Sequence, residues 1–419
     1  MGYMIYYYKY NDKILFSFYE YKGLQKISEN KAITSKENLY FLNKMDPIKS
    51  RRSFLVNDPS LLFLDREGLE LILLTNKNFP LDLPGWIIDR IKAKLVISVN
   101  TEYPNWQTAL EDPPKDKWNI NIVALGDVGS TLLIGLRLLG GDCINKIGIY
   151  DRNENRLKRW VYETNQIREA FNPWKFPVVE AITKEELFNC HMIVFCASKG
   201  VPPVGSIVKD VRMTQFSSNS QIIKEYAKLA RHYNFKGIFA VVSDPVDLLC
   251  KVVFLESNKD ANGNMDFKGL ASNQIIGYGL GVMNARACFY AEMSQNTIHF
   301  LEEGRVFGPH GEGLIVANSI ENYDEKISNY LTEKTINANK EIRSFGFKPY
   351  VAPSLSSGAL SIISTIRGEW FYGSTYMGNA YMGSKVRLIK GHLELERLKL
   401  PDKLYEKIKE SYERLVTIL

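Results

Sequence analysis

A glycine-containing turn after an apolar run carries the residues of this chain whose types and spacing point most clearly to chemistry. The run Ile120-Asn-Ile-Val-Ala-Leu125 is followed by Gly126, Asp127, Val128 and Gly129. The first of these glycines lets the backbone approach a pyrophosphate, and the second lets the following helix pack on the sheet. The free N–H groups at the start of that helix then face phosphate oxygens. The segment therefore predicts a strand, turn and helix that bind a dinucleotide.

A carboxylate follows at the end of the next apolar run, Ile147-Gly-Ile-Tyr150. Asp151 lies 22 residues after Gly129. At this place in a βαβ unit a carboxylate accepts hydrogen bonds from the adenosine ribose and repels a 2′-phosphate. The spacing therefore favours NAD over NADP as the cofactor. Arg152 comes directly afterwards and weakens this preference slightly.

Two details of the turn depart from the usual three-glycine pattern. Ala124 takes the place of the first glycine, which is tolerable if this residue keeps a negative φ. Asp127 puts a carboxylate at a helix N-terminus, where it suits the helix dipole but not a bound pyrophosphate. The alternative interpretation is a connection between strand and helix that binds nothing.

The composition of the 419-residue chain is that of an ordinary soluble globular protein, with 45% apolar and 24% charged residues. The net charge of +6 comes without a dense run of Lys or Arg, which argues against nucleic-acid binding. The five cysteines form no CxxC pair, and no metal site is predicted. Four of them lie in or beside apolar runs and are expected to be buried free thiols: Cys143, Cys190, Cys196 and Cys250. No apolar run has membrane-spanning length and the N-terminus lacks a signal-peptide pattern, so we expect a cytoplasmic protein without a membrane partner.

Alternating strand and helix patterns over residues 116–275 predict an α/β fold with a doubly wound parallel sheet. The predicted strands cover residues 120–125, 146–150, 177–179, 192–196 and 237–243, and the predicted helices cover 154–170, 184–189 and 221–232. Residues 276–419 form a further unit. It ends in an amphipathic helix after Pro401, with Asp402 as the expected N-cap.

Residues 1–115 differ from the rest of the chain in their pattern of apolar and aromatic runs. They predict a separate small α/β domain of unknown role. Apolar and aromatic runs predict strands at 4–10, 13–19, 61–64 and 94–99, and an amphipathic pattern predicts a short helix at 85–92. The polar, proline-bearing segment 101–117 is the expected linker to the next domain.

From residue 118 onward, several segments in order resemble the lactate/malate dehydrogenase family. They are Val194-Phe-Cys-Ala-Ser198, a loop ending in Arg212, Val241-Val-Ser-Asp-Pro-Val-Asp247, Ile275-Ile-Gly-Tyr-Gly-Leu-Gly-Val-Met-Asn-Ala-Arg286 and Phe307-Gly-Pro-His-Gly-Glu312. The resemblance implies a Rossmann-type domain over 116–275 and an α+β catalytic domain over 276–419. It implies hydride transfer between NAD and a small 2-hydroxy or 2-oxo acid.

The resemblance also implies roles for single residues. His310 matches the proton-transfer histidine, although a lone histidine in a turn is more often a surface residue. Arg286 matches the arginine that binds the substrate carboxylate, and its alternative is a salt bridge on a helix surface. Arg212 matches the arginine of the mobile loop that closes over substrate, with Lys209 as an alternative because this loop is longer than usual.

Four further residues fall at positions that the family places near its ligands. Ala197 and Ser243 fall beside the cofactor, and Ser356 and Ser357 fall where a small hydroxyl residue lies near the substrate. Serines before a glycine are also common in any turn. The family forms dimers and tetramers, which implies self-association.

Two positions break the family pattern. Met283 stands where the family has the aspartate that holds its histidine, and Asp244 stands where the family has an asparagine that contacts substrate and nicotinamide. We hypothesise that Asp244 supplies the negative charge that Met283 removed, or that it binds a cationic substrate group such as an amine. The alternative is that the catalytic machinery has decayed. The Asp244–Pro245 bond is expected to be cis, because the matching bond in the family is.

These observations predict an NAD-dependent oxidoreductase that acts on a small carboxylate substrate, whose identity the sequence leaves open. The alternative is a catalytically altered or silent NAD-binding member of the family with a regulatory or partner-binding role. Met283 favours the alternative. The presence of His310, Arg286 and Arg212 together favours the enzyme.

Overall fold

The computed structural model describes residues 4–74, 83–199 and 211–418. Its largest element is a nine-stranded sheet in the order β17-β16-β15-β12-β11-β10-β7-β8-β9. The six strands from β12 to β9 in that order are parallel, and the other three are antiparallel. The strand bounds are β7 Trp118–Val123, β8 Ile144–Tyr150, β9 Val178–Ala181, β10 Met192–Phe195, β11 Ile238–Val241, β12 Ile275–Gly277, β15 Phe371–Tyr376, β16 Tyr381–Ile389 and β17 His392–Leu395.

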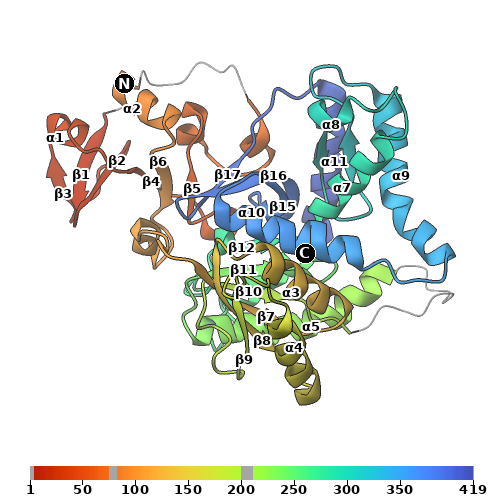
Figure 1. Cartoon of the computed structure of the whole chain (residues 1–419). Coiled ribbons are helices and arrows are strands. Elements are labelled where there is room, and N and C mark those ends of the chain that lie inside the picture. Colours follow the sequence, from red (N-terminus) through yellow and green to blue (C-terminus); the bar gives the residue numbers. More distant parts are fainter. Residues whose placement is uncertain (1–3, 75–82, 200–210, 419) are drawn as a thin grey trace.

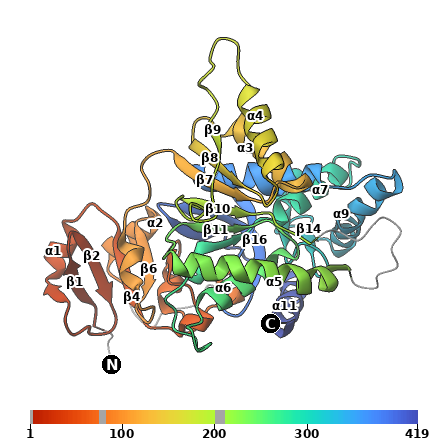
Figure 2. The ribbon, with the colours of Figure 1, turned by 90° about the horizontal axis from the view of Figure 1, so that it is seen from below.

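Helices cover both faces of the parallel strands. Figure 2 shows α3 and α4 on one face and α5 and α6 on the other. Their bounds are α3 Asp127–Leu139, α4 Glu154–Gln166, α5 Val211–His232 and α6 Val246–Ser257. The middle strand β10 is buried along its whole length, as a parallel strand covered on both faces must be. The arrangement confirms the predicted Rossmann-type doubly wound sheet.

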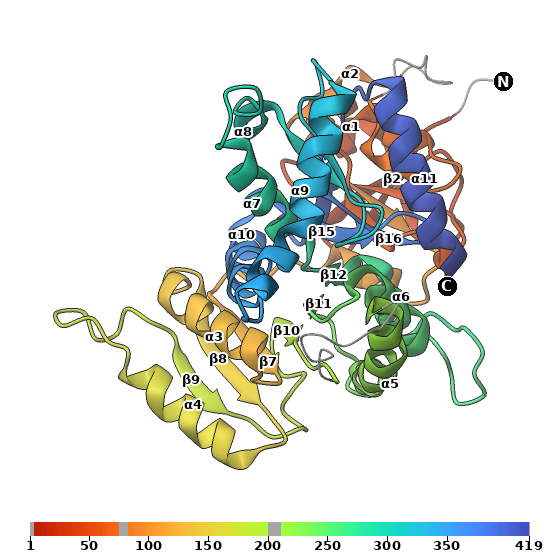
Figure 3. The same cartoon turned by 90° about the vertical axis from the view of Figure 1, so that its right-hand side faces the viewer.

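The C-terminal part adds helices and a small hairpin beside this sheet (Figure 3). The elements are α7 Leu280–Ala291, α8 Phe300–Glu303, β13 Arg305–Phe307, β14 Ile315–Ala317, α9 Glu325–Ser344, a π-helical segment Pro353–Leu360, α10 Ser361–Arg367 and α11 Asp402–Ile418. Asp402 is the first residue of α11 and not its N-cap, because the chain already turns into the helix at Pro401, whose carbonyl accepts from the Tyr405 amide.

A second sheet lies at the N-terminal end, on the left of Figure 1, in the order β3-β1-β2-β4-β6-β5. Strands β2, β4 and β6 are parallel to one another, and the remaining pairs are antiparallel. The bounds are β1 Tyr6–Tyr10, β2 Lys13–Ser17, β3 Gln25–Ile27, α1 Glu29–Ile33, β4 Leu39–Asn43, β5 Ser53–Leu55, α2 Gly85–Lys92 and β6 Val96–Asn100.

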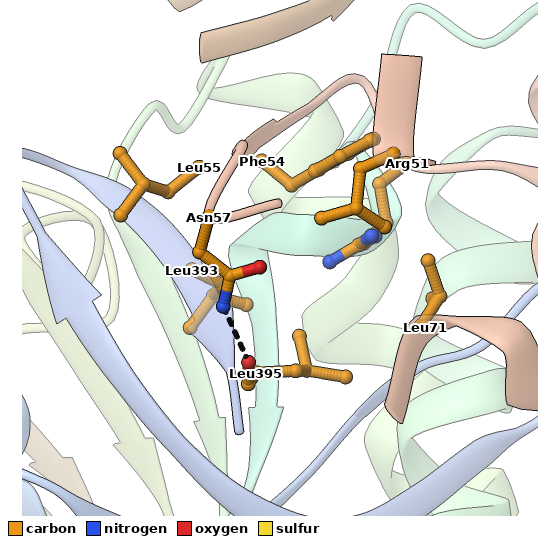
Figure 4. Close-up of a pocket in the computed structure, with 8 residues that line it drawn as sticks. Arg51, Phe54, Leu55, Asn57, Leu71, Leu393 and Leu395 are labelled. Carbon is orange, nitrogen blue, oxygen red and sulfur yellow. Dashed lines mark hydrogen bonds between the residues drawn. The ribbon is translucent and has the colours of Figure 1, made fainter. Parts of the chain in front are cut away.

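The last strand of the large sheet ties this N-terminal region to the rest of the chain. Arg397 forms an ion pair with Asp58 at 3.1 Å, and the buried carboxylate of Glu394 pairs with Lys94 at 2.7 Å. Asn57 donates to the Leu395 carbonyl at 2.9 Å, at the edge of a small cavity of about 10 Å³ (Figure 4). That volume is enough for one water molecule. The contacts anchor the N-terminal sheet along β17.

Four predicted elements differ from the structure. In place of the strand predicted at 61–64, residues 61–63 belong to a 3₁₀-helix, Pro59–Phe63, because Pro59 occupies its first turn and Asp58 accepts from the Ser60 amide. Residues 184–189 form turns in place of a helix, since so short a segment gains too few hydrogen bonds to offset nucleation. Helix α4 ends at Gln166, before the predicted residue 170, and α5 begins at Val211, ten residues before the predicted start.

None of the helices within the described residues is long and apolar enough to cross a membrane.

Candidate functional site

The candidate site lies at the carboxyl ends of β7, β10 and β11. After β7 the chain continues to β8 on one side, and β10 follows on the other side of β7, so the strand order reverses between these two neighbours. In a doubly wound sheet the connections that leave two such strands diverge and open a crevice where ligands bind. The glycine turn leaves β7 at this point, and the segment from Cys196 to Lys199 leaves β10.

The glycine turn has the close helix-to-strand contact that its sequence predicts. A Cβ atom added to Gly129 would lie 2.0 Å from the Ala124 carbonyl oxygen, so only glycine fits there. A Cβ atom added to Gly126 would meet no atom within 4 Å. The space beside Gly126 and the open N–H groups at the start of α3 are what a phosphate group requires.

Ala124 does not meet the condition of a negative φ. Its φ is +71°, in the left-handed region that glycine adopts freely and other residues seldom adopt. The tight turn imposes on this residue the backbone conformation of the usual glycine. The Ala124 amide still donates to the Tyr150 carbonyl at 2.8 Å, which holds the turn against β8.

Asp151 is buried beneath the turn. It accepts from the Leu125 amide at 2.8 Å and from the Asn153 amide at 2.9 Å, and Arg156 pairs with it at 3.2 Å. Its carboxylate therefore supports the glycine turn directly, a role that the sequence did not predict. An ionised carboxylate offers about four lone-pair sites, so the predicted ribose contact is compatible with these bonds.

Hydrogen bonds connect the ends of β10 and β11. The Ser243 hydroxyl donates to the Ala197 carbonyl at 2.8 Å. Asn219, on α5, donates to the Asp244 carbonyl at 2.7 Å and accepts from the Lys199 amide at 2.9 Å. Asn219 is 1% exposed, and the sequence analysis gave it no role. These bonds fix the backbone around the predicted cofactor contacts Ala197 and Ser243.

His310 and Asp244 form the central contact of the site. His310 Nδ1 lies 2.9 Å from Asp244 Oδ1. The histidine is in the segment between β13 and β14, and the aspartate follows β11 at a peptide bond with Pro245 that is cis, as expected. The Asp244 side chain is 45% exposed and the His310 side chain is 11% exposed.

The surroundings of His310 hold its ring in one orientation. The His310 amide donates to the carboxylate of Asp247, whose pKa is raised by burial. A Cβ atom added to Gly279 would lie 2.9 Å from the His310 Cβ, so the glycine makes room for the histidine. His310 Nε2 is buried and has no hydrogen-bond partner within the described parts of the chain. An imidazole with one nitrogen on a carboxylate and the other without a hydrogen-bond partner can take or give a proton at that second nitrogen.

Arg286 lies on α7 and is 9% exposed. Its guanidinium donates to Asn339 Oδ1 on α9 and lies 3.7 Å from the sulfur of Met283. The methionine that replaces the expected aspartate therefore packs against the arginine one helical turn away.

Ser357 has a structural part that the sequence did not predict. Its hydroxyl donates to the Gly279 carbonyl at 2.7 Å and accepts from the Val282 amide at 2.8 Å, which caps the start of α7. The carbonyl of Ser356 accepts from the Ser361 hydroxyl at 2.8 Å. For both serines the predicted substrate contact stays a prediction.

Arg212 is the second residue of α5, but its side chain lies outside the described part of the chain. The alternative residue Lys209 lies outside it altogether. The predictions for these two cations stay open.

Asp127 has a partner that sequence patterns do not reveal. Its carboxylate lies 3.2 Å from the ammonium of Lys348, which follows α9 and is 221 residues away in the chain. No local spacing rule connects residues so far apart.

Comparison with known proteins gives matches to one family. A family model described as the lactate/malate dehydrogenase NAD-binding domain matches residues 118–266. The L-lactate dehydrogenase of Macrococcus caseolyticus is 28% identical over 196 residues, which are 46% of this chain and 54% of that protein, so the match spans about half of the relative. The L-lactate dehydrogenase of Corynebacterium jeikeium is 24% identical over 299 residues, 64% of this chain and 84% of that protein.

Solved structures match over a longer stretch and show the fold. A lactate dehydrogenase from a Medee basin deep-sea metagenome library superposes with a TM-score of 0.58 at 20% identity, covering 72% of this chain and 98% of that one. A malate dehydrogenase from Plasmodium falciparum superposes with a TM-score of 0.56 at 16% identity, covering 71% of this chain and 96% of that one. These structures show the fold, and the family model shows that residues 118–266 form a lactate/malate dehydrogenase NAD-binding domain of the Rossmann type.

Proposed function

We propose that the protein is an NAD-dependent oxidoreductase that transfers hydride between nicotinamide and a small 2-hydroxy or 2-oxo acid. The observation that carries the proposal is the 2.9 Å contact between His310 Nδ1 and Asp244 Oδ1, with Nε2 left without a partner in the described residues. The sequence raised a doubt because Met283 replaces the acid that holds the histidine in the family. Asp244 can perform the same task from the segment after β11, in place of an acid on α7.

The chemistry requires the histidine to hold its proton at a defined nitrogen. When Nδ1–H donates to the Asp244 carboxylate, Nε2 carries the lone pair that accepts the proton of the substrate hydroxyl. The carboxylate then stabilises the imidazolium that forms. A bound nicotinamide supplies the hydride acceptor when the alcohol is oxidised. In the reverse direction Nε2–H returns its proton to the carbonyl oxygen.

The remaining predicted residues would bind the two ligands. Gly126, Asp127, Val128 and Gly129 would surround the pyrophosphate at the start of α3, as the open space beside Gly126 supports. Further along the crevice the cofactor would contact Asp151, Ala197 and Ser243. Arg286 and Arg212 would hold the substrate carboxylate, since a guanidinium can donate to both of its oxygens. Ser356, Ser357 and Asp244 complete the proposed substrate side.

Met283 supports a second candidate, a catalytically silent NAD-binding protein with a regulatory or partner-binding role. In that case the N-terminal sheet, which β17 anchors to the rest of the chain, would carry the partner site. Assembly into dimers or tetramers and a cytoplasmic location are predictions common to both candidates.

The deciding experiment is NADH oxidation by the purified chain with pyruvate, oxaloacetate, longer 2-oxo acids and amino-bearing analogues. His310→Gln is compared with His232→Gln, a matched change at an exposed position at the end of α5. We expect turnover with one substrate class, its loss in H310Q and normal turnover in H232Q. NADH binding without turnover on any substrate would favour the silent protein.

A further inference from the structure

An ion pair joins the start of α3 to the C-terminal part of the chain. Asp127 is the first residue of α3, directly after Gly126. Its Oδ2 lies 3.2 Å from Lys348 Nζ, and the two side chains are 52% and 70% exposed. An exposed ion pair of this kind contributes little to the free energy of folding, so stability is a poor explanation for it.

The same carboxylate stands at an unfavourable place for a dinucleotide. A pyrophosphate at the N-terminus of α3 is attracted by the helix dipole and by the open N–H groups. A neighbouring carboxylate opposes that attraction through charge repulsion. The ammonium of Lys348 cancels the negative charge of Asp127 at the point where the phosphates would lie.

The segment that carries Lys348 is held firmly against α3. Lys348 precedes the π-helical segment Pro353–Leu360, which packs on α3 so closely that glycines are needed on both sides. A Cβ atom added to Gly135 would lie 2.6 Å from the Ala359 Cβ, and one added to Gly358 would lie 2.6 Å from Leu132 Cδ1. Figures 1 and 3 show α3 running beside the helical segments that follow α9. This packing places the chain around Lys348 beside α3, and the ion pair with Asp127 brings its ammonium to the glycine turn.

We propose that Lys348 is a ligand of the cofactor pyrophosphate, held at the start of α3 by Asp127. The inference rests on the proposed function, since it requires a dinucleotide at the glycine turn. An ammonium has three N–H donors, so it can contact the carboxylate and a phosphate oxygen together. Lys348 comes from the C-terminal part, so the bound cofactor would contact that part as well as the NAD-binding domain.

The test measures binding and needs no turnover. NADH binding is followed by fluorescence, and ADP-ribose and adenosine binding by calorimetry, for the wild type, Lys348→Met, Asp127→Asn and the double variant. Lys326→Met, at an exposed lysine in the first turn of α9, is the matched control. We expect K348M to weaken NADH and ADP-ribose about fivefold to tenfold at low salt, with a smaller loss at high salt. Adenosine, which has no phosphate, should bind K348M and wild type alike.

The double variant separates a phosphate ligand from a merely structural ion pair. K348M leaves the Asp127 charge uncompensated, so D127N/K348M should bind ADP-ribose more tightly than K348M alone. If the ion pair is merely structural, the two single variants should lose ADP-ribose affinity equally, and the double variant should recover none of it. That result, or unchanged ADP-ribose binding in K348M, would overturn the inference while leaving the proposed function intact. A wild type that binds neither NADH nor ADP-ribose would overturn both.

Discussion

The two sides of the candidate site are assembled in different ways. On the cofactor side, the glycine turn and the acid after β8 come from one continuous unit between Trp118 and Asp151, in which the turn, α3 and β8 follow one another along the chain. The reaction side joins His310 to Asp244 across 66 residues and Arg286 to Asn339 across 53. Local geometry dictates the first, whereas the packing of distant segments dictates the second.

This difference separates the features that the local path of the chain fixes from those that depend on packing. The turn conformation survives even with Ala124 at a positive φ, because the short path from β7 to α3 leaves no alternative. The acid partner of the histidine has only to reach Nδ1, and a carboxylate after β11 does so as well as one on α7 would. A missing acid at one position is therefore weak evidence for a decayed site.

The largest expected effect concerns this acid. Asp244→Asn keeps the size of the side chain but removes the charge that fixes the histidine tautomer, so kcat should fall about 10³- to 10⁴-fold. The pH profile of kcat should change as well, because the imidazolium loses its stabilising partner. Steady-state kinetics across pH measures both effects.

A companion variant sharpens the comparison. D244N/M283D places the acid on α7, at the position that the family uses, and should recover part of the lost rate. An unchanged rate in D244N alone would mean that Asp244 does not hold the histidine during the reaction.

The second prediction concerns the rigidity of the cofactor side. Gly129→Ala forces a Cβ to within 2.0 Å of the Ala124 oxygen, so α3 must shift. We expect the free energy of unfolding to fall by about 2 kcal/mol and NADH binding to weaken. Gly126→Ala is the matched control for folding, because its Cβ meets no atom within 4 Å. Denaturant unfolding of both variants measures the effect, and equal stabilities would contradict the tight turn.

The third prediction concerns the effect of the buried Asp247 carboxyl group on the free energy of unfolding. Burial raises the pKa of Asp247 above its usual value of 3.8, so the folded state holds the proton longer than the unfolded state as the pH rises. Stability is therefore lost between pH 3.8 and the raised pKa of the folded state. Asp247→Asn keeps an acceptor for the His310 amide and should remove that loss.

The measurement for this prediction is denaturant unfolding across a pH series. The free energy of unfolding of D247N should be close to that of the wild type below pH 3.8. Above that pH the variant should become the more stable of the two proteins. The same dependence of the free energy of unfolding on pH in both proteins would show that ionisation of Asp247 does not destabilise the fold.

The smallest effect is expected at Ala124. Ala124→Gly should stabilise the fold by about 1 kcal/mol or less, because relief of the positive φ is partly offset by the entropy that glycine adds to the unfolded chain. Thermal unfolding with and without NADH measures it. A lower melting temperature would mean that the methyl group makes favourable contacts that outweigh the strained backbone.

The sequence predicted the Rossmann-type sheet because its signals are local. Each buried strand is an apolar run, and the glycine turn is a pattern of six residues. It failed at 61–64 and 184–189, where short apolar or polar runs carry no signal that separates a strand or helix from a turn. Likewise the length of α5 depends on what it packs against and not on its own composition.

The candidate site divides in the same way. The sequence by itself determined the glycine turn, the acid after β8, and the types of residue at 244, 283, 286 and 310, because these depend on spacing along the chain. Only the tertiary structure decided that Asp244 meets His310, that Ser357 caps α7, and that Lys348 neutralises Asp127. Each of these contacts joins residues at least 66 apart. Such contacts form only when α6, α7, α9 and the segments between them have packed on the sheet, and no local pattern specifies that packing.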